Sequence, residues 1–339
     1  MDFTLIKTLP GEPDFLLFES ILDRIYPPLS STSKKKEIIN PDYLHAAYVL
    51  MSQDKAVARC CLYHNPLLRY QGDSACCIGN FESIDNADCS GELLRLVAKE
   101  ARALGSSFVI GPMNGSTWNN YRLGLNPEMP TFFLEPDAPA YYPDLFLKAG
   151  FQPIARYVSH KDEIRRNGRF SNEKYQEASW KNTLHFRELD LENYEAELKK
   201  LYRFCMQSFI RNFLFTPISE DTFMMNYLRL KPYLDARYII LAEDADNNLV
   251  GLVFCVPNHY DTVRRGLIVK TIARNPLADY KGLGSALAGM IETRAISGDY
   301  DYLIHALMLD SNVSRQISEQ FSGTAWKEYA LYGKTISTL

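Results

Sequence analysis

The chain divides into two halves in which the apolar and polar positions predict the same elements in the same order. In each half, two apolar, β-branched runs flank a short polar turn, at 46–66 around Asp54 and at 238–258. Such a pattern is typical of a β-hairpin. One further strand is predicted after each hairpin, at 74–84 and at 265–276.

An amphipathic helix and a last apolar strand complete the predicted unit in each half. The apolar positions of the helices recur at helical spacing. They are Leu93, Leu94, Val97 and Ala101 in the first half, and Leu283, Leu287, Met290 and Ile291 in the second. The last strands are predicted at 106–114 and 302–312, and each ends at an asparagine, Asn114 or Asn312.

The two halves also share their spacing. In each half, a similar number of residues separates the hairpin turn from a glycine at the predicted start of the helix. The interval runs from Asp54 to Gly91 in the first half and from Asn248 to Gly284 in the second. A repeat of this length indicates a duplicated domain. The order of elements predicts a mixed α/β (α+β) fold, in which helices cover mostly antiparallel, twisted sheets.

A polar and charged stretch at 160–183 separates the halves and predicts a linker or an exposed crossover. A chain of 339 residues is long enough for two domains. We therefore expect one domain at 1–165, a linker at 166–182 and a second domain at 183–339.

Composition and charge narrow the class of protein. Hydrophobic residues make up 46% of the chain and charged residues 23%, as in soluble globular proteins. The formal net charge of -4 provides no overall basic field for a nucleic acid or an anionic membrane. No apolar run approaches the roughly 20 residues that span a bilayer. We expect no signal peptide, because the first residues have no basic segment followed by an apolar stretch. We expect a cytoplasmic protein without a nucleic-acid or membrane partner; the sequence predicts no oligomeric state.

The seven cysteines predict buried, reduced thiols. Cys60–Cys61 and Cys76–Cys77 are adjacent pairs in predicted strands, so that neighbouring side chains point to opposite faces. No C-x-x-C spacing occurs, and an odd number of cysteines does not suit a disulfide framework. We expect no metal site.

A glycine-rich turn opens the second predicted helix. In "ADYKGLGSALAG" (278–289), Gly282 and Gly284 let the backbone bend so that the N–H groups of residues 281–285 face one point. The positive end of the helix dipole adds to the attraction for phosphate. The alternative is an ordinary helix start in which the glycines only relieve strain.

The longer stretch "IARNPLADYKGLGSAL" (272–287) resembles the acyl-CoA-binding motif of the GNAT acyltransferase superfamily, in which a strand ending in proline leads into Arg/Gln-x-x-Gly-x-Gly/Ala and a helix. Pro276, Gly282 and Gly284 stand at the matching positions, whereas Asp279 replaces the Arg/Gln. The first half resembles the same fold but has Cys89 in place of Gly282. The chain is therefore similar to a tandem GNAT protein, with two GNAT-like domains and one intact cofactor site.

The resemblance implies an N-acyltransferase that moves an acetyl or other acyl group from acetyl-CoA, or another acyl-CoA, to a primary amine of a small molecule or amino-bearing metabolite. The implied cofactor-binding residues are Ile272, Ala273, Lys281, Gly282, Leu283, Gly284, Ser285 and Asn312. Two alternatives stay open: a catalytically decayed ligand-binding or interaction protein, and an aminoacyl-tRNA-dependent transferase, against which the net charge argues.

The groups that would move protons are not identified by the resemblance, because Glu319 replaces the family's tyrosine. The incoming amine must lose a proton before it can attack. Weak candidates are Tyr329, Tyr332, His305 and Glu243. Each of them is also explained by packing in a strand or by a turn.

The loop "GPMNGSTWNNYR" (111–122) carries recognition chemistry in the first half. Amide and hydroxyl groups donate and accept hydrogen bonds, tryptophan offers a stacking face, and arginine binds a carboxylate or phosphate. The candidate substrate-binding residues are Asn114, Ser116, Trp118, Tyr121 and Arg122. The alternative is a rigid loop whose tryptophan fills the domain core.

Overall fold

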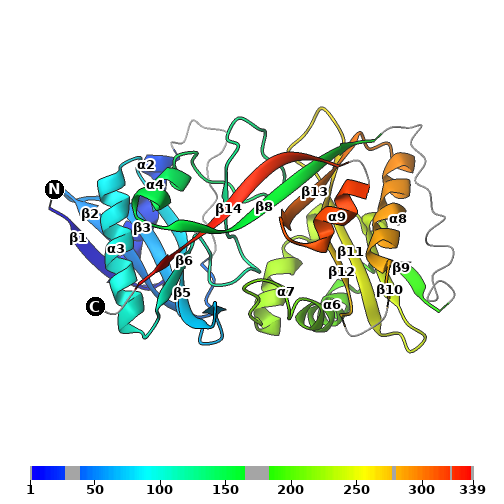
Figure 1. Ribbon diagram of the computed structural model, residues 1–339, viewed down its shortest axis with the longest axis horizontal. Helices are drawn as coiled ribbons and strands as arrows, with labels where there is room; N and C mark the ends of the chain where they lie inside the picture. The colour runs from blue at the N-terminus through cyan, green and yellow to red at the C-terminus, as the bar shows by residue number, and fades with distance from the viewer. Residues whose placement is uncertain (1, 27–38, 165–182, 277–279, 321–322, 337–339) are drawn as a thin grey trace.

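In the described part of the chain, fourteen strands form one continuous sheet that runs through both halves (Figure 1). The computed structural model describes residues 2–26, 39–164, 183–276, 280–320 and 323–336. The strands of the first half are β1 (Thr4–Thr8), β2 (Leu44–Ser52), β3 (Lys55–Tyr63), β4 (Arg69–Tyr70), β5 (Asp73–Ser83), β6 (Phe108–Gly111), β7 (Leu123–Gly124) and β8 (Gln152–Glu163). Those of the second half are β9 (His185–Glu188), β10 (Ile239–Glu243), β11 (Leu249–Pro257), β12 (Gly266–Arg274), β13 (Tyr302–Leu309) and β14 (Thr324–Thr335).

The strand order is symmetric about the middle of the sheet. Counted from one edge, the strands of the first half occur in the same order as the equivalent strands of the second half counted from the other edge. The main path is β1-β2-β3-β5-β6-β14-β8-β13-β12-β11-β10-β9. The pairs β5–β6 and β12–β13 are parallel, and the other pairs are antiparallel. Both predicted hairpins, β2–β3 and β10–β11, are confirmed.

The last strand of each half lies in the sheet of the other half. β8 pairs with β13 and β14, whereas β14 pairs with β6, β7 and β8. Figure 1 shows this long β8–β14 ribbon crossing the middle of the molecule. The two halves are therefore joined by main-chain hydrogen bonds as well as by side-chain packing.

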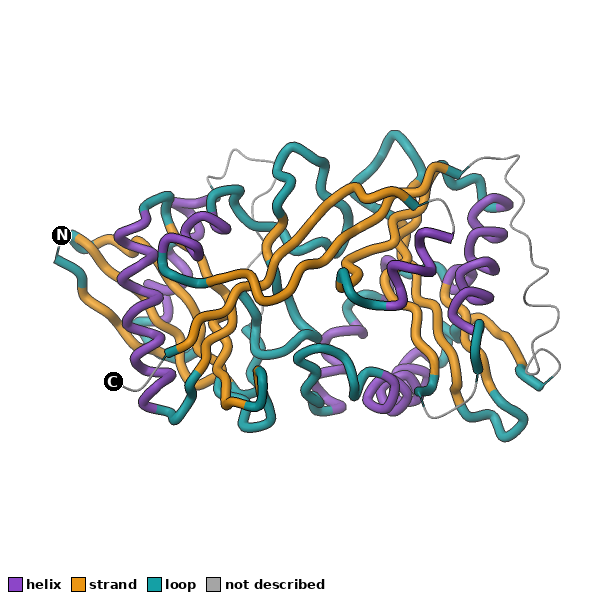
Figure 2. Tube along the Cα trace, in the orientation of Figure 1, coloured by secondary structure: helices purple, strands orange, loops and turns teal. Residues whose placement is uncertain are grey.

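Helices cover both faces of the sheet (Figure 2). The first half has α1 (Phe15–Ser20), α2 (Leu22–Ile25), α3 (Ala87–Ala103) and α4 (Tyr142–Lys148). The second has α6 (Tyr194–Ser208), α7 (Glu220–Leu228), α8 (Leu283–Ser297), α9 (Val313–Gln320) and two 3-10 turns, η1 (Lys231–Tyr233) and η2 (Ala236–Tyr238). The predicted apolar faces of α3 and α8 are confirmed, since they pack in the cores of the two halves.

Three predicted boundaries were wrong. β6 and β13 end three residues before Asn114 and Asn312, because the chain leaves the sheet at Gly111 and at Leu309. The polar stretch at 160–183 does not begin outside the sheet: residues 160–163 are part of β8, where backbone pairing to β13 outweighs their polarity.

The remaining predictions about the fold have mixed outcomes. All seven cysteines lie in the described part of the chain and are buried there without disulfides, as predicted. The predicted linker at 166–182 lies outside the described residues, so the proposed domain boundaries stay a prediction. No helix in the described part of the chain combines the length and the apolar composition needed to cross a bilayer.

Candidate functional site

The two parallel strands of the second half separate from one another midway along their length. β12 pairs with β13 only over Gly266–Val269 and Tyr302–His305. Beyond this point each strand has an irregularity, at Lys270 in β12 and between His305 and Met308 in β13. Bulges bend a strand locally, and a cavity of 1360 Å³ opens where the strands have separated.

The start of α8 lies on the wall of this cavity. Gly282 has a φ of +88°, which favours glycine, and it provides no side chain to cap the first N–H groups of the helix. Lys281, Gly282, Gly284 and Ser285 line the cavity. The helix dipole and the uncapped first turn make this wall attractive to an anion such as phosphate.

The other predicted cofactor-binding residues divide between the cavity and the core. Ile272, Ala273 and Asn312 line the cavity. Leu283 does not, because its side chain is fully buried in the core beneath α8. Asp279 lies outside the described residues.

The equivalent space in the first half is filled by the chain itself. After β5 and β6 separate, Met113 N donates to Ile78 O at 2.8 Å and Asn80 N donates to Asn114 Oδ1 at 2.7 Å. A Cβ atom on Gly79 would lie only 2.5 Å from Met113 O. The start of α3 is also occupied, since the Asn86 side chain accepts from two of its N–H groups. These contacts leave no room for a phosphate there.

The loop at 111–122 instead reaches into the cavity of the second half. Asn114, Trp118, Tyr121 and Arg122 line the cavity. Ser116 does not; its hydroxyl accepts from Trp118 N at 3.3 Å and holds the loop. The structure therefore brings the predicted cofactor-binding turn and most of the predicted substrate-binding loop to one cavity.

Trp118 joins the two halves. Its ring packs against Phe209, Phe215 and Phe223, with ring centroids 5.7 to 6.0 Å apart. Its Nε1 donates to Thr216 O at 3.0 Å. The ring thus fills an aromatic cluster of the second half rather than the core of its own half, and it also lines the cavity.

Arg122 is held between two tyrosine rings. Its guanidinium carbon lies 3.7 Å from the ring centroid of Tyr121 and 4.2 Å from that of Tyr157. Its Nη1 donates to Leu307 O at 2.9 Å, so the loop of the first half is hydrogen-bonded to the bulge of β13. Stacking and this hydrogen bond fix the plane of the guanidinium at the cavity wall.

Lys270 is the cationic residue at the bulge of β12, and it lines the cavity. Burial and, to a smaller extent, the positive charge of Arg122 lower the pKa of its ammonium to about 7, although Glu135 opposes the change. Near neutral pH a substantial fraction of this amine is uncharged and can accept a proton.

Two histidines share one serine hydroxyl beside the cavity. Ser318 Oγ lies 2.9 Å from His160 Nδ1 and 2.5 Å from His305 Nδ1. All three side chains are buried, and burial lowers the pKa of both histidines, that of His305 to about 4. A hydroxyl between two neutral imidazoles donates to one and accepts from the other, so the three groups can pass a proton from His305, at the cavity wall, to β8.

Neither candidate tyrosine lines the cavity. Tyr329 is buried, and its hydroxyl donates to Glu135 Oε1 at 2.6 Å, in a cluster that includes the buried Lys327. Tyr332 packs against Phe146 in the core of the first half, with ring centroids 5.7 Å apart. Burial raises the pKa of both hydroxyls. The structure therefore does not bring either tyrosine to the site.

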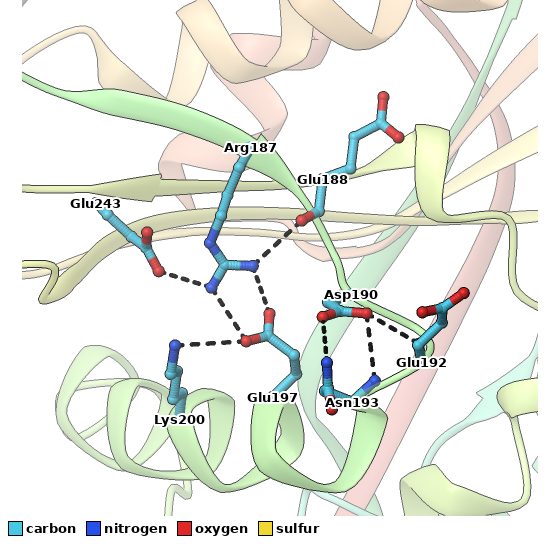
Figure 3. Close-up of polar contacts among 8 residues, drawn as sticks. All are labelled: Arg187, Glu188, Asp190, Glu192, Asn193, Glu197, Lys200 and Glu243. Atoms are coloured by element: carbon cyan, nitrogen blue, oxygen red, sulfur yellow. Dashed lines mark hydrogen bonds and ion pairs between the residues drawn. The ribbon is translucent and has the colours of Figure 1, made fainter.

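Glu243 belongs to an ion cluster at the far edge of the sheet (Figure 3). Arg187 Nη2 lies 2.6 Å from Glu243 Oε1, and Arg187 Nη1 lies 2.6 Å from Glu197 Oε2 on α6. The hydrogen bond from Arg187 lowers the pKa of Glu243. Glu243 does not line the cavity, and its contacts attach α6 to the edge strands.

Replacing Arg187 by methionine should destabilise the fold. Glu197 and Glu243 are both buried, at 5% exposure, and would lose the cation that they share, with Lys200 Nζ, 3.5 Å from Glu197 Oε1, left beside Glu197. We expect the free energy of unfolding at pH 7, measured by urea denaturation, to fall by about 2–4 kcal/mol. The matched control is Arg237→Met, which removes an exposed ion pair of the same 2.6 Å length to Asp235. Equal unfolding free energies for the two variants would contradict the prediction.

Several residues of the site carried weak signals in the sequence. Lys270 interrupts the apolar strand "GLIVKTIA" (266–273), and a lone charge at the centre of such a strand could have identified it. His160 was grouped with the polar stretch, so its place in β8 was missed. Ser318 had no signal of its own, because only the packing of α9 against β13 brings it between the histidines.

Comparison with solved structures shows a fold similar to that of known N-acetyltransferases. A GCN5-related N-acetyltransferase from Anabaena variabilis ATCC 29413 is similar with a TM-score of 0.59 and 9% identity, over 98% of this chain and 73% of that one. A tandem GNAT protein from the clavulanic acid biosynthesis pathway matches with 0.55 and 8%, over the full length of both chains. A GCN5-related glucosamine N-acetyltransferase region of a fungal multi-domain GH3 β-N-acetylglucosaminidase matches with 0.58 and 13%, over 98% of this chain but 38% of that one. No family model and no curated protein matches the sequence.

Proposed function

We propose that this chain, which has the tandem GNAT fold that its sequence resembles, transfers an acyl group from acetyl-CoA or another acyl-CoA to a primary amine. The observation that carries the proposal is the position of the glycine turn of α8, which faces a cavity opened by the separation of β12 and β13. A helix start that can attract phosphate, beside the point where two strands separate, suits a long ligand with a charged end and a reactive thioester.

The cavity is large enough for a donor and an acceptor together. Pockets for one small molecule usually have about 300–1,000 Å³, and this cavity has 1360 Å³. We propose that Lys281 and the first turn of α8 hold the phosphates of the acyl-CoA, and that Ile272 and Ala273 lie along the rest of it. The acyl-CoA supplies an activated carbonyl carbon; the chain supplies position and proton transfer.

Lys270 is the proposed proton acceptor. A free amine is protonated near neutral pH and cannot attack until it loses a proton. Lys270 faces the cavity, is uncharged in part near pH 7, and follows Val269, the backbone partner of His305. The His305–Ser318–His160 chain offers a route by which a proton moves from the cavity toward β8.

Ligand-dependent stabilisation tests the donor site. We expect CoA and acetyl-CoA to raise the melting temperature, since a ligand at about 100 times its Kd stabilises the fold by about 2.7 kcal/mol. ATP is the matched control, because it carries a nucleotide and phosphates without the pantetheine arm. No shift with either CoA species at millimolar concentration, or an equal shift with ATP, would contradict the proposal. Binding without thiol release from any amine would favour the ligand-binding alternative.

A further inference from the structure

The charged side chains that line the cavity have one sign. Those in the described part of the chain are all cationic, and no aspartate or glutamate is among them. They are Arg122, Arg211, Arg229, Lys270, Arg274 and Lys281. The whole chain, by contrast, has a formal net charge of -4. A cavity lined by one sign of charge concentrates molecules of the opposite sign.

The proposed donor accounts for only some of these cations. Arg274 and Lys281 flank the turn that precedes α8, where phosphates would bind. Arg122 enters from the first half of the chain, on a different wall, and is 6% exposed. It is stacked between Tyr121 and Tyr157, and both of its hydrogen bonds go to backbone carbonyl groups. No carboxylate of the described residues forms an ion pair with it.

A buried guanidinium of this kind is costly unless an anion accompanies it. Its planar group is already fixed, so an anion binding there loses little additional side-chain freedom. A carboxylate or a phosphate accepts the charge-assisted hydrogen bonds that a guanidinium donates. A polycationic amine, by contrast, would meet Arg122 and Lys270 without a compensating carboxylate among the described lining residues.

We infer that the acceptor amine carries an anionic group, a carboxylate or a phosphate, and that Arg122 binds this group from the first-half wall of the cavity. The inference rests on the proposed function and specifies its substrate class. The first half of the chain then supplies acceptor recognition, and the second half supplies the donor site.

Pairs of amines that differ only in the anion test the inference. Thiol release from acetyl-CoA is measured with L-phenylalanine against L-phenylalaninamide, with O-phosphoethanolamine against ethanolamine, and with spermidine as a polycation. We expect the anionic member of at least one pair to have a kcat/KM at least about 10-fold higher, as for a charge-assisted hydrogen bond. The two pairs distinguish a carboxylate from a phosphate. The same probes, added with CoA, are also compared by thermal shift, which needs no turnover.

Variants of Arg122 assign the preference to this residue. Arg122→Gln should reduce the preference to about 3-fold or less, mainly by raising KM for the anionic amine, while Arg122→Lys should restore part of it. Arg95→Gln on α3 is the charge-matched control, since Arg95 is exposed and pairs with Glu92. Equal reaction and equal stabilisation by both members of both pairs, or a preference unchanged in both Arg122 variants, would overturn the inference. If the inference is overturned in this way but CoA still raises the melting temperature, the proposed donor site stands. If CoA does not raise the melting temperature, the proposed function itself is overturned.

Discussion

Replacing Gly284 by aspartate should abolish stabilisation by CoA without unfolding the protein. Gly284 lies in the first turn of α8 and lines the cavity. A Cβ atom there would lie 3.2 Å from Ile317 Cδ1, the flexible end of a side chain, so the fold can adjust. A carboxylate at this position would repel phosphate, although it favours the helix start itself. We therefore expect the melting temperature without ligand to stay close to that of the wild type, and the CoA-induced shift to disappear.

The repeat supplies a matched control for this variant. Gly91→Asp introduces the same change in α3, at the fifth residue of the helix, where a Cβ atom would have nothing within 4 Å. The start of α3 is occupied by the side chain of Asn86, so this variant should keep the full CoA-induced shift. Gly284→Ala separates size from charge and should weaken the shift without removing it. A full shift in Gly284→Asp would mean that CoA does not bind at α8.

Replacing Lys270 by methionine should lower activity and raise stability together. Positioned general bases typically contribute about 10²–10⁴-fold to rate, and we expect a loss of kcat/KM in this range. Methionine has a similar length and no charge to desolvate, so the variant should unfold with a free energy higher by about 1–3 kcal/mol at pH 6 to 7. Thiol release and urea denaturation measure the two effects on the same preparation.

The pH dependence of both effects follows from the pKa of Lys270. In the unfolded chain a lysine has a pKa near 10.4, whereas in the fold that of Lys270 is about 7. The unfolded state therefore binds more protons between these values, and wild-type stability from this group rises with pH across that interval. The amount by which the free energy of unfolding of Lys270→Met exceeds that of the wild type should be largest below pH 7 and vanish near pH 10. Wild-type kcat/KM should rise as pH increases through 7, because Lys270 must be uncharged.

Lys270→Arg separates the role of a proton acceptor from that of a positive charge. Arginine stays protonated, so this variant should lose activity as the methionine variant does, but without any gain in stability. Retained activity in either variant would exclude Lys270 as the proton acceptor. Since Arg122 and Glu135 also act on the ammonium, their side chains are kept unchanged in these measurements.

The donor side of the site could be predicted from the sequence, whereas the rest depended on the path of the chain in space. Gly282 can be recognised locally, because the left-handed turn before a helix favours glycine, and Gly284 follows it in the first turn of α8. Arg122 and Trp118 were recognised as candidate recognition residues, but their entry into the cavity of the other half is a property of the assembled sheet. The mutual position of His160 and Ser318 arises from β8 lying beside β13, and hydrophobic periodicity contains no information about that pairing.

The same periodicity predicted the strands but not their exchange. The apolar pattern of β14 predicts a strand, but it does not specify that this strand lies beside β6 and β8. Glu243 shows a related limit, because its partner Arg187 lies on a strand that is far from it in sequence. Residues whose role depends on a distant partner therefore could not be assigned from local patterns.

The exchange of β8 and β14 has a consequence for the order of synthesis. As the chain leaves the ribosome, the neighbours of β8 in the sheet, β13 and β14, are not yet made. β6 likewise keeps an open edge until residues 324–335 emerge. Unpaired edges of this kind can pair with other chains. The nascent first half must therefore remain incompletely folded until almost all the described chain has been translated, and both sheets are completed in the same late step.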